Sequence, residues 1–187
     1  RLVDGVWQQD GVRTKDGQFI RPTTRFRNWV TPDGSAGPSG EGGFAAEAGR
    51  YHLYVSLSCP WAHRTVIFRK LKALESVISM STVAPDMLKD GWTFNIDEGS
   101  SGDTVNGKSK LSEIYLIADP RYTGRVSVPV LWDKKRKTIV NNESPEIIRM
   151  LNASFDAFTN VHTDFYPQAL RAEIDRINDI VYPNINN

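Results

Sequence analysis

The alternation of hydrophobic and polar residues changes character near residue 50. Residues 1–48 scatter aromatic residues among turn formers with no sustained period, which predicts an irregular N-terminal arm. From Tyr51 to Ser58, hydrophobic residues occupy every second position, which predicts a β-strand. The organised part of the chain is therefore expected to begin at about residue 49.

A helical spacing follows this strand directly. Ile67, Leu71 and Leu74 recur at helical intervals with Phe68 beside them, which predicts a helix from about Pro60 to Leu74. Residues 77–83 then resemble a second strand. A helix that crosses between two neighbouring strands makes them parallel, so residues 51–83 predict a βαβ unit.

The pattern continues with a helix, two strands and another helix. Residues 111–118 predict a helix, and residues 128–132 and 138–141 predict strands joined by a basic turn. Ser144 and Pro145 begin a third helix, with Ser144 expected as its cap. The same helix N-terminus could also hold a ligand carboxylate. The predicted order is β-α-β-α-β-β-α, an α/β fold.

A polar connector leads to one more helix, which begins near Pro167. Its hydrophobic residues share one face: Leu170, Ile174, Ile177 and Val181. No preceding element is left to cover this face, which predicts a further helical domain or a partner. We expect an arm (1–48), an α/β domain (49–152), and a linker with the first helix of a truncated helical domain (153–187).

Composition narrows the class of protein. With 40% hydrophobic and 24% charged residues, the chain is typical of globular proteins, and no apolar run approaches the roughly 20 residues of a membrane span. The formal net charge of +1 offers no general attraction for nucleic acid or anionic lipid. One cysteine and no hydrophobic signal segment favour a reducing compartment, the cytoplasm.

The single cysteine, Cys59, lies where the first strand gives way to the helix. Proline is favoured at the first helical position, so Pro60 places Cys59 at the N-cap. The helix dipole and backbone N–H groups stabilise an anion there, which predicts a nucleophilic thiolate rather than a buried structural cysteine. His63 and Arg64 follow in the first turn and either tune the thiolate or are ordinary, partly exposed helix residues.

Ala62 occupies the position where a dithiol oxidoreductase has its second cysteine. With a dithiol mechanism disfavoured, the chemistry expected is monothiol exchange, in which a small molecule supplies the second thiol. In a reducing compartment we expect this small molecule to be glutathione. The three histidines and one cysteine are widely spaced, so no metal site is expected.

A competing motif lies between Gly102 and Ser109, which match the phosphate-binding pattern G-x-x-x-x-G-K-[ST]. The residues before it, 94–98, are not an apolar strand and add two carboxylates where phosphates would bind. Pro129 is ill suited to a central parallel strand, and base rates alone predict a trans Val128–Pro129 bond. We expect no nucleotide binding.

Four segments in order resemble the glutathionyl-hydroquinone reductases, the Xi class of glutathione transferases: residues 58–64 (SCPWAHR), 91–94 (GWTF), 119–133 (DPRYTGRVSVPVLWD) and 141–144 (NNES). The likeness extends from about residue 25 to residue 187. It implies a thioredoxin-like N-terminal domain followed by the start of an all-helical glutathione-transferase C-terminal domain.

The resemblance also implies roles for individual residues. Cys59 matches the catalytic cysteine. Val128 and Pro129 match a cis-proline pair, which leaves the Val128 backbone to pair with the cysteinyl unit of glutathione. Glu143 and Ser144 match residues that hold the γ-glutamyl end.

Trp92 and Arg125 match further positions that line the glutathione site. The implied reaction reduces a glutathionyl-hydroquinone through a Cys59–glutathione mixed disulfide, which a second glutathione resolves. The alternatives are an Omega-like thioltransferase or dehydroascorbate reductase, and a non-catalytic glutathione-binding module. We expect a cytoplasmic homodimer that uses glutathione as cosubstrate, with no metal, nucleic acid or membrane partner. The helical domain, which in the family supplies the hydroquinone pocket, stops here after its first helix.

Overall fold

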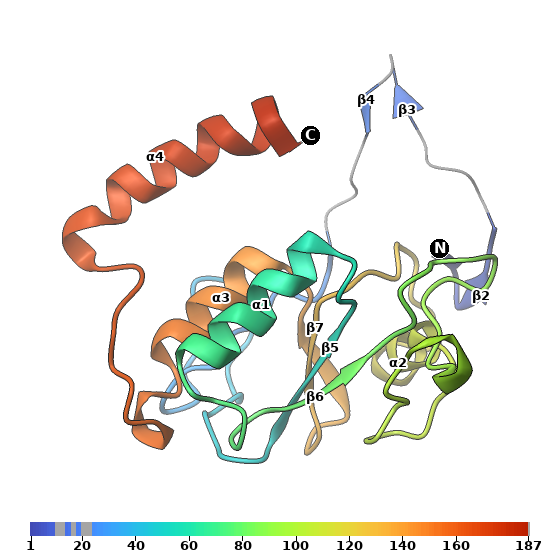
Figure 1. Cartoon of the computed structure of the whole chain (residues 1–187), viewed down its shortest axis with the longest axis horizontal. Helices are drawn as coiled ribbons and strands as arrows, with labels where there is room; N and C mark the ends of the chain where they lie inside the picture. The colour runs from blue at the N-terminus through green and yellow to red at the C-terminus, as the bar shows by residue number, and fades with distance from the viewer. Residues whose placement is uncertain (10–13, 16–17, 20–23, 187) are drawn as a thin grey trace.

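A four-stranded mixed sheet forms the centre of the molecule, in the order β6-β5-β7-β8 (Figure 1). The computed structural model describes residues 1–9, 14–15, 18–19 and 24–186. β5 and β6 are parallel, and the pairs β5–β7 and β7–β8 are antiparallel. The strands are β5 (Tyr51–Val55), β6 (Ser79–Thr82), β7 (Val130–Asp133) and β8 (Thr138–Asn141).

Three helices cover the two faces of this sheet. Two of them, α1 and α3, lie side by side on one face, and α2 lies on the other (Figure 1). The helices are α1 (Pro60–Leu71), α2 (Leu111–Ala118) and α3 (Ser144–Ala153). From β5 to α3 the order of strands and α-helices is β-α-β-α-β-β-α, which confirms the predicted thioredoxin-like domain.

Strand β5 is buried on both faces, although its sequence alternates. His52 and Tyr54 occupy the polar positions of the pattern, and both are fully buried. The Tyr54 hydroxyl donates a hydrogen bond to Asp103 (2.8 Å), and Nδ1 of His52 lies 2.7 Å from the Ser79 hydroxyl. Burial lowers the pKa of His52 to about 4, so this ring is neutral at physiological pH. The alternation therefore identifies the strand but not its exposure.

The inward face of α1 is formed by small side chains. Ile67 and Leu71 are 47% and 46% exposed, whereas Ala62 and Thr65 are fully buried. Small side chains let α1 lie close to the sheet and α3, which large ones would prevent. The helix was predicted to reach about Leu74 but ends at Leu71, and Leu74, which follows it, is buried.

The N-terminal arm is largely irregular, as predicted, yet its described part belongs to the core. Leu2, Val30 and Phe44 are buried with the residues of the sheet. Two short hairpins lie before residue 20: β1 (Leu2–Val3) with β2 (Val6–Trp7), and β3 (Thr14–Lys15) with β4 (Gln18–Phe19). Residues 10–13, 16–17 and 20–23 of the predicted arm lie outside the described residues.

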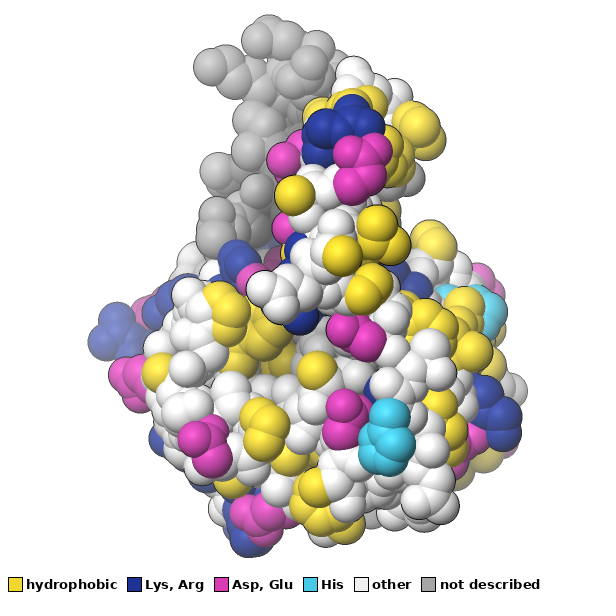
Figure 2. All heavy atoms as spheres, turned by 90° about the vertical axis from the view of Figure 1, so that its left-hand side faces the viewer, with side chains coloured by type: hydrophobic (Ala, Val, Ile, Leu, Met, Phe, Trp, Pro, Cys, Tyr) yellow, Lys and Arg dark blue, Asp and Glu magenta, His cyan; other side chains and the backbone are white. Residues whose placement is uncertain are grey.

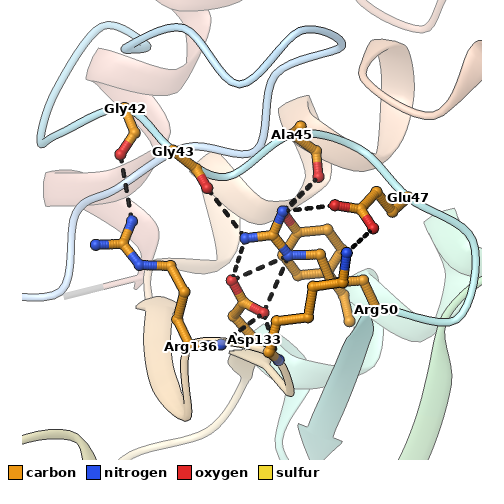
Figure 3. Close-up of polar contacts among 9 residues, drawn as sticks. Gly42, Gly43, Ala45, Glu47, Arg50, Asp133 and Arg136 are labelled. Carbon is orange, nitrogen blue, oxygen red and sulfur yellow. Dashed lines mark hydrogen bonds and ion pairs between the residues drawn. The ribbon is translucent and has the colours of Figure 1, made fainter.

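A buried ion pair holds the arm to the sheet (Figure 3). The Arg50 guanidinium pairs with Asp133 at the end of β7, and it also donates to the carbonyl oxygens of Gly43 and Ala45 and to Glu47. The hydrogen bonds to Asp133 raise the pKa of Arg50 above its usual value, although burial alone would lower it. The arm and the α/β unit therefore share one core, and the boundary at residue 48 stays a prediction.

The last helix, α4 (Arg171–Val181), extends away from the sheet (Figure 1). Hydrophobic side chains stand exposed along this part of the chain (Figure 2), among them Leu170 at 54%, Ile177 at 43% and Ile180 at 48%. Short helical turns complete the chain: η1 (Ile96–Glu98), η2 (Asp156–Phe158), η3 (Gln168–Leu170) and η4 (Tyr182–Asn186). No helix among the described residues is long and apolar enough to cross a membrane.

Candidate active site

Three predicted segments meet at one edge of the sheet because of strand direction. β5 runs toward this edge and leads into Cys59. β7 begins there, with Val130 opposite Tyr54, and β8 ends there, with Asn141 opposite Leu131. The edge therefore receives three segments predicted for the site: Cys59, Val128–Pro129 and Glu143–Ser144.

Cys59 is the N-cap of α1, as predicted. Its backbone is extended (φ −94°, ψ 114°), Pro60 begins the helix, and its carbonyl oxygen accepts the N–H groups of Ala62 (3.1 Å) and His63 (2.9 Å). The thiol is partly buried and makes no capping hydrogen bond to the helix. Its sulfur thus lies at the positive end of the helix dipole, where an anion is stabilised. The nucleophilic role stays a prediction.

The Val128–Pro129 peptide bond is cis. This agrees with the family resemblance and not with the base rate for X-Pro bonds. Both residues are buried at the start of β7. The proline lies just before the strand, where it removes no hydrogen bond from the ladder.

Arg64 connects the first turns of α1 and α3. Its Nε and Nη2 atoms donate to the Ser144 hydroxyl at 3.0 and 2.7 Å, and its guanidinium lies 5.1 Å from the centre of the Trp61 ring. The packing of α1 beside α3 brings Arg64 to Ser144, and the role of Arg64 in the site stays open. His63 in the same turn is exposed.

The cap of α3 corrects the prediction by one residue. Glu143 is the N-cap, with extended backbone (φ −99°, ψ 109°), and its carbonyl oxygen accepts the N–H groups of Glu146 and Ile147. Ser144 is the first helical residue. Because it already lies inside the helix, it is not in the N-cap position, and its hydroxyl accepts from Arg64.

Trp92 precedes α2, and Arg125 lies in the loop that leads to Val128. The carbonyl oxygen of Trp92 accepts the N–H of Leu111 at the start of α2 (2.9 Å). Arg125 is exposed in the loop that leads to Val128, and its carbonyl oxygen accepts the Tyr122 hydroxyl (3.1 Å). Their contacts with a ligand stay predictions.

The phosphate-like loop at residues 102–109 is filled by its own carboxylate. Oδ1 of Asp103 accepts the N–H groups of Val105 (3.0 Å) and Asn106 (3.1 Å), and Oδ2 accepts the N–H of Lys108 (2.9 Å). These are the kinds of donors that would cradle a phosphate. Within the described ranges, no group of three His, Cys, Asp or Glu residues could hold a metal ion.

Comparison with known proteins agrees with this arrangement. Residues 58–154 match the family described as glutathione S-transferase, N-terminal domain. Glutathionyl-hydroquinone reductase YqjG of Escherichia coli is 56% identical over 100% of this chain and 58% of its own length. Glutathione S-transferase omega-like 2 of Schizosaccharomyces pombe is 46% identical over 93% of this chain and 55% of its own length.

Solved structures of glutathione transferases have the same fold as this chain. The glutathione-bound structure of YqjG superposes with a TM-score of 0.89 at 54% identity, covering 100% of this chain and 56% of that one. The Xi-class transferase of Natrialba magadii gives 0.87 at 48% identity, covering 100% and 56%. The chain spans a little over half the length of these relatives. It belongs to the glutathione S-transferase family, whose N-terminal domain it contains, and its relatives include Xi-class glutathionyl-hydroquinone reductases.

Proposed function

We propose that this protein reduces glutathionyl-hydroquinones to hydroquinones with glutathione as cosubstrate, and that Cys59 is its nucleophile. The observation that carries the proposal is the position of Cys59. It is the N-cap of α1, at the sheet edge that also receives the cis Val128–Pro129 bond and the start of α3. A helix N-terminus favours a thiolate there.

The reaction has two balanced steps. The Cys59 thiolate attacks the sulfur of the glutathionyl-hydroquinone. A sulfur–sulfur bond forms, the carbon–sulfur bond breaks, and the electrons of that bond remain on the ring carbon, which takes up a proton. A second glutathione thiolate then attacks the mixed disulfide, releasing oxidised glutathione and the Cys59 thiolate. The ring carbon is reduced, and two glutathione sulfurs are oxidised.

The remaining residues of the site hold glutathione in this proposal. The Val128 backbone pairs with the cysteinyl unit beside Pro129, while Glu143 and Ser144 hold the γ-glutamyl end. Trp92 and Arg125 line the site, and the forked donors of Arg125 suit a carboxylate. Arg64 adds positive charge near Ser144, with which it is in contact.

The second candidate is thioltransferase or dehydroascorbate reductase activity of the Omega type. The omega-like name of the Schizosaccharomyces pombe relative favours it, because the same cysteine chemistry would serve both reactions. We also propose that the protein is a homodimer and that it works in the cytoplasm.

Two assays on the full-length protein test these proposals. With the glutathione conjugate of 1,4-benzohydroquinone, we expect one hydroquinone and one oxidised glutathione per turnover, at a higher kcat/KM than with dehydroascorbate. Intact-mass analysis after exposure to oxidised glutathione should show one glutathione adduct on Cys59. Faster reduction of dehydroascorbate would favour the second candidate, and an absent adduct would reject the mechanism.

A further inference from the structure

The hydroxyl of Tyr115, a fully buried residue of α2, joins two separate parts of the chain. It donates to the carbonyl oxygen of Ser127 (2.8 Å) and accepts the N–H of the same residue (3.2 Å). It also accepts the side-chain amide of Asn142 (2.8 Å). The Ser127 hydroxyl also lies 3.4 Å from the Tyr115 hydroxyl. The Tyr115 hydroxyl therefore serves as both donor and acceptor, and these partners belong to Ser127 and Asn142.

The two residues that Tyr115 holds directly precede the two groups assigned to glutathione. Ser127 precedes Val128, assigned to the cysteinyl unit, and Asn142 precedes Glu143, assigned to the γ-glutamyl unit. One segment leads into β7 and the other leaves β8. The Tyr115 hydroxyl therefore connects, within the core, the segment that carries Val128 to the segment that carries Glu143.

Neighbouring contacts make this bridge rigid on the α3 side. The Asn141 side chain accepts the N–H of Glu143 (2.7 Å). Thr24, from the N-terminal arm, donates to the side-chain oxygen of Asn142 (2.6 Å). Burial raises the pKa of Tyr115, so the phenol keeps its proton and remains a donor.

We propose that Tyr115 is a positioning residue that fixes the spacing between the Val128 backbone and Glu143, and so matches the site to the distance between the cysteinyl and γ-glutamyl units of glutathione. The inference rests on the proposed function. Tyr115 acts through its neighbours and not by touching the ligand, so its effect belongs to binding and not to bond making.

The first test replaces Tyr115 with phenylalanine in the full-length protein. Removing the hydroxyl leaves buried donors and an acceptor unsatisfied, so Tyr115→Phe should weaken glutathione binding about tenfold. KM for glutathione should rise while kcat at saturation changes little. Tyr51→Phe is the matched control. The hydroxyl of the buried Tyr51 donates a hydrogen bond to the carbonyl oxygen of Ala45 in the arm (2.7 Å), and its removal should leave glutathione affinity unchanged.

A double-mutant cycle separates positioning from simple loss of stability. If Tyr115 positions Glu143, then Glu143→Ala should cost less affinity in the Tyr115→Phe background than in the wild type. Should Tyr115→Phe fail to fold, Asn142→Ala removes one contact of the bridge and serves in its place, with the same direction of effect. Additive losses in the cycle would show a merely structural role and overturn the inference.

The outcomes also separate this inference from the proposed function. Direct calorimetric titration of the wild type with glutathione decides the function first, and a wild type that does not bind glutathione overturns both. A wild type that binds, with a Tyr115→Phe variant that binds equally well, overturns the role of Tyr115 alone. A loss of affinity as large in Tyr51→Phe as in Tyr115→Phe would overturn it too.

Discussion

Two regions of this molecule are built to attract an anion, and they use their donors differently. In the loop 102–109, the Asp103 carboxylate accepts the backbone N–H groups of Val105, Asn106 and Lys108. At the starts of α1 and α3, the N-cap side chains of Cys59 and Glu143 make no capping hydrogen bond to their helices. The loop uses its backbone N–H groups to bind its own carboxylate, whereas the first N–H groups of the two helices are not bound by their N-cap side chains.

This difference shows that a segment with a phosphate-binding sequence pattern can bind phosphate only if its backbone N–H donors are not already bound to another group. The loop has the glycine and lysine spacing of a phosphate site, but its carboxylate replaces the phosphate. The site at the sheet edge has no such pattern in sequence, since its parts come from three distant segments. Substitutions in each region can test this contrast.

The largest effect is expected at the α1 start. Cys59→Ser should abolish reductase turnover, because a hydroxyl satisfies the helix N-terminus but cannot form the mixed disulfide. We expect a loss of at least about a thousandfold in kcat, or ~4 kcal/mol of barrier. The measurement is glutathionyl-hydroquinone reduction by wild type and variant at saturating glutathione.

Serine is nearly isosteric with cysteine, so the fold serves as the control for this variant. Thermal unfolding midpoints should agree closely, and calorimetry should still detect glutathione binding. The glutathione adduct expected on Cys59 of the wild type should be absent from the variant. Turnover within about tenfold of wild type, a barrier change of only ~1.4 kcal/mol, would mean that Cys59 is not the nucleophile.

The next effect is on affinity at the α3 start and the preceding loop. Glu143→Ala and Arg125→Ala should each weaken glutathione binding by roughly tenfold to a hundredfold, since a charge-assisted contact contributes about 1.5–3 kcal/mol. Turnover at saturation should fall less than affinity, because neither group makes or breaks bonds. Calorimetry gives the affinity and saturated kinetics the turnover, and unchanged affinity in both variants would reject the site assignment.

Much of the fold was predictable because local pattern and covalent constraint determine it. Helices and strands from residue 51 to residue 153 lie close to their predicted positions, and Pro60 alone places Cys59 at a helix start. The exposed faces were not predictable. Ile67 belongs to the hydrophobic spacing that predicts α1, yet it is 47% exposed, since the packing of α1 against α3 favours small residues.

The site was predictable only in part, for a related reason. Cys59 follows from local sequence, whereas the roles of Val128, Glu143 and Trp92 came from the family resemblance. Long-range strand register brings the Val128 and Glu143 segments to the end of β5. Local spacing does not encode the contact of Arg64 with Ser144 or that of Tyr115 with Asn142. Contacts across the sheet edge require the fold to be known.

A moderate effect on stability is expected in the loop. Burial works to raise the pKa of Asp103, but hydrogen bonds from the Lys108 and Asn106 backbone and the Tyr54 hydroxyl outweigh it and lower the pKa. A carboxyl with a lowered pKa stabilises the fold above its unfolded-state value of about 3.9, and that contribution is lost as the pH falls through the folded-state value. Asp103→Asn should therefore reduce the free energy of unfolding by roughly 1–3 kcal/mol at neutral pH.

Urea unfolding of wild type and Asp103→Asn over a series of pH values measures this contribution. The difference between the two proteins should be constant near neutrality and should shrink below about pH 4, where the carboxylate begins to take up a proton. Glutathione affinity at neutral pH should stay the same in the variant. A stability difference that does not change with pH would show that the charge of Asp103 is not what holds the loop.

The smallest effect is expected from Lys108, and its smallness is the sharpest test of the contrast between the two regions. In a phosphate-binding loop the lysine reaches the phosphates and its loss removes nucleotide binding. Here the N–H of Lys108 is bound to Asp103, and a second negative charge beside that carboxylate would be repelled. Calorimetric titration with ATP and Mg²⁺ should give no binding in the micromolar range for wild type or for Lys108→Ala, and glutathione affinity should be equal in both. Micromolar ATP binding by the wild type that disappears in Lys108→Ala would mean that the loop donors are available after all, and the distinction between a self-filled loop and the helix starts would fail.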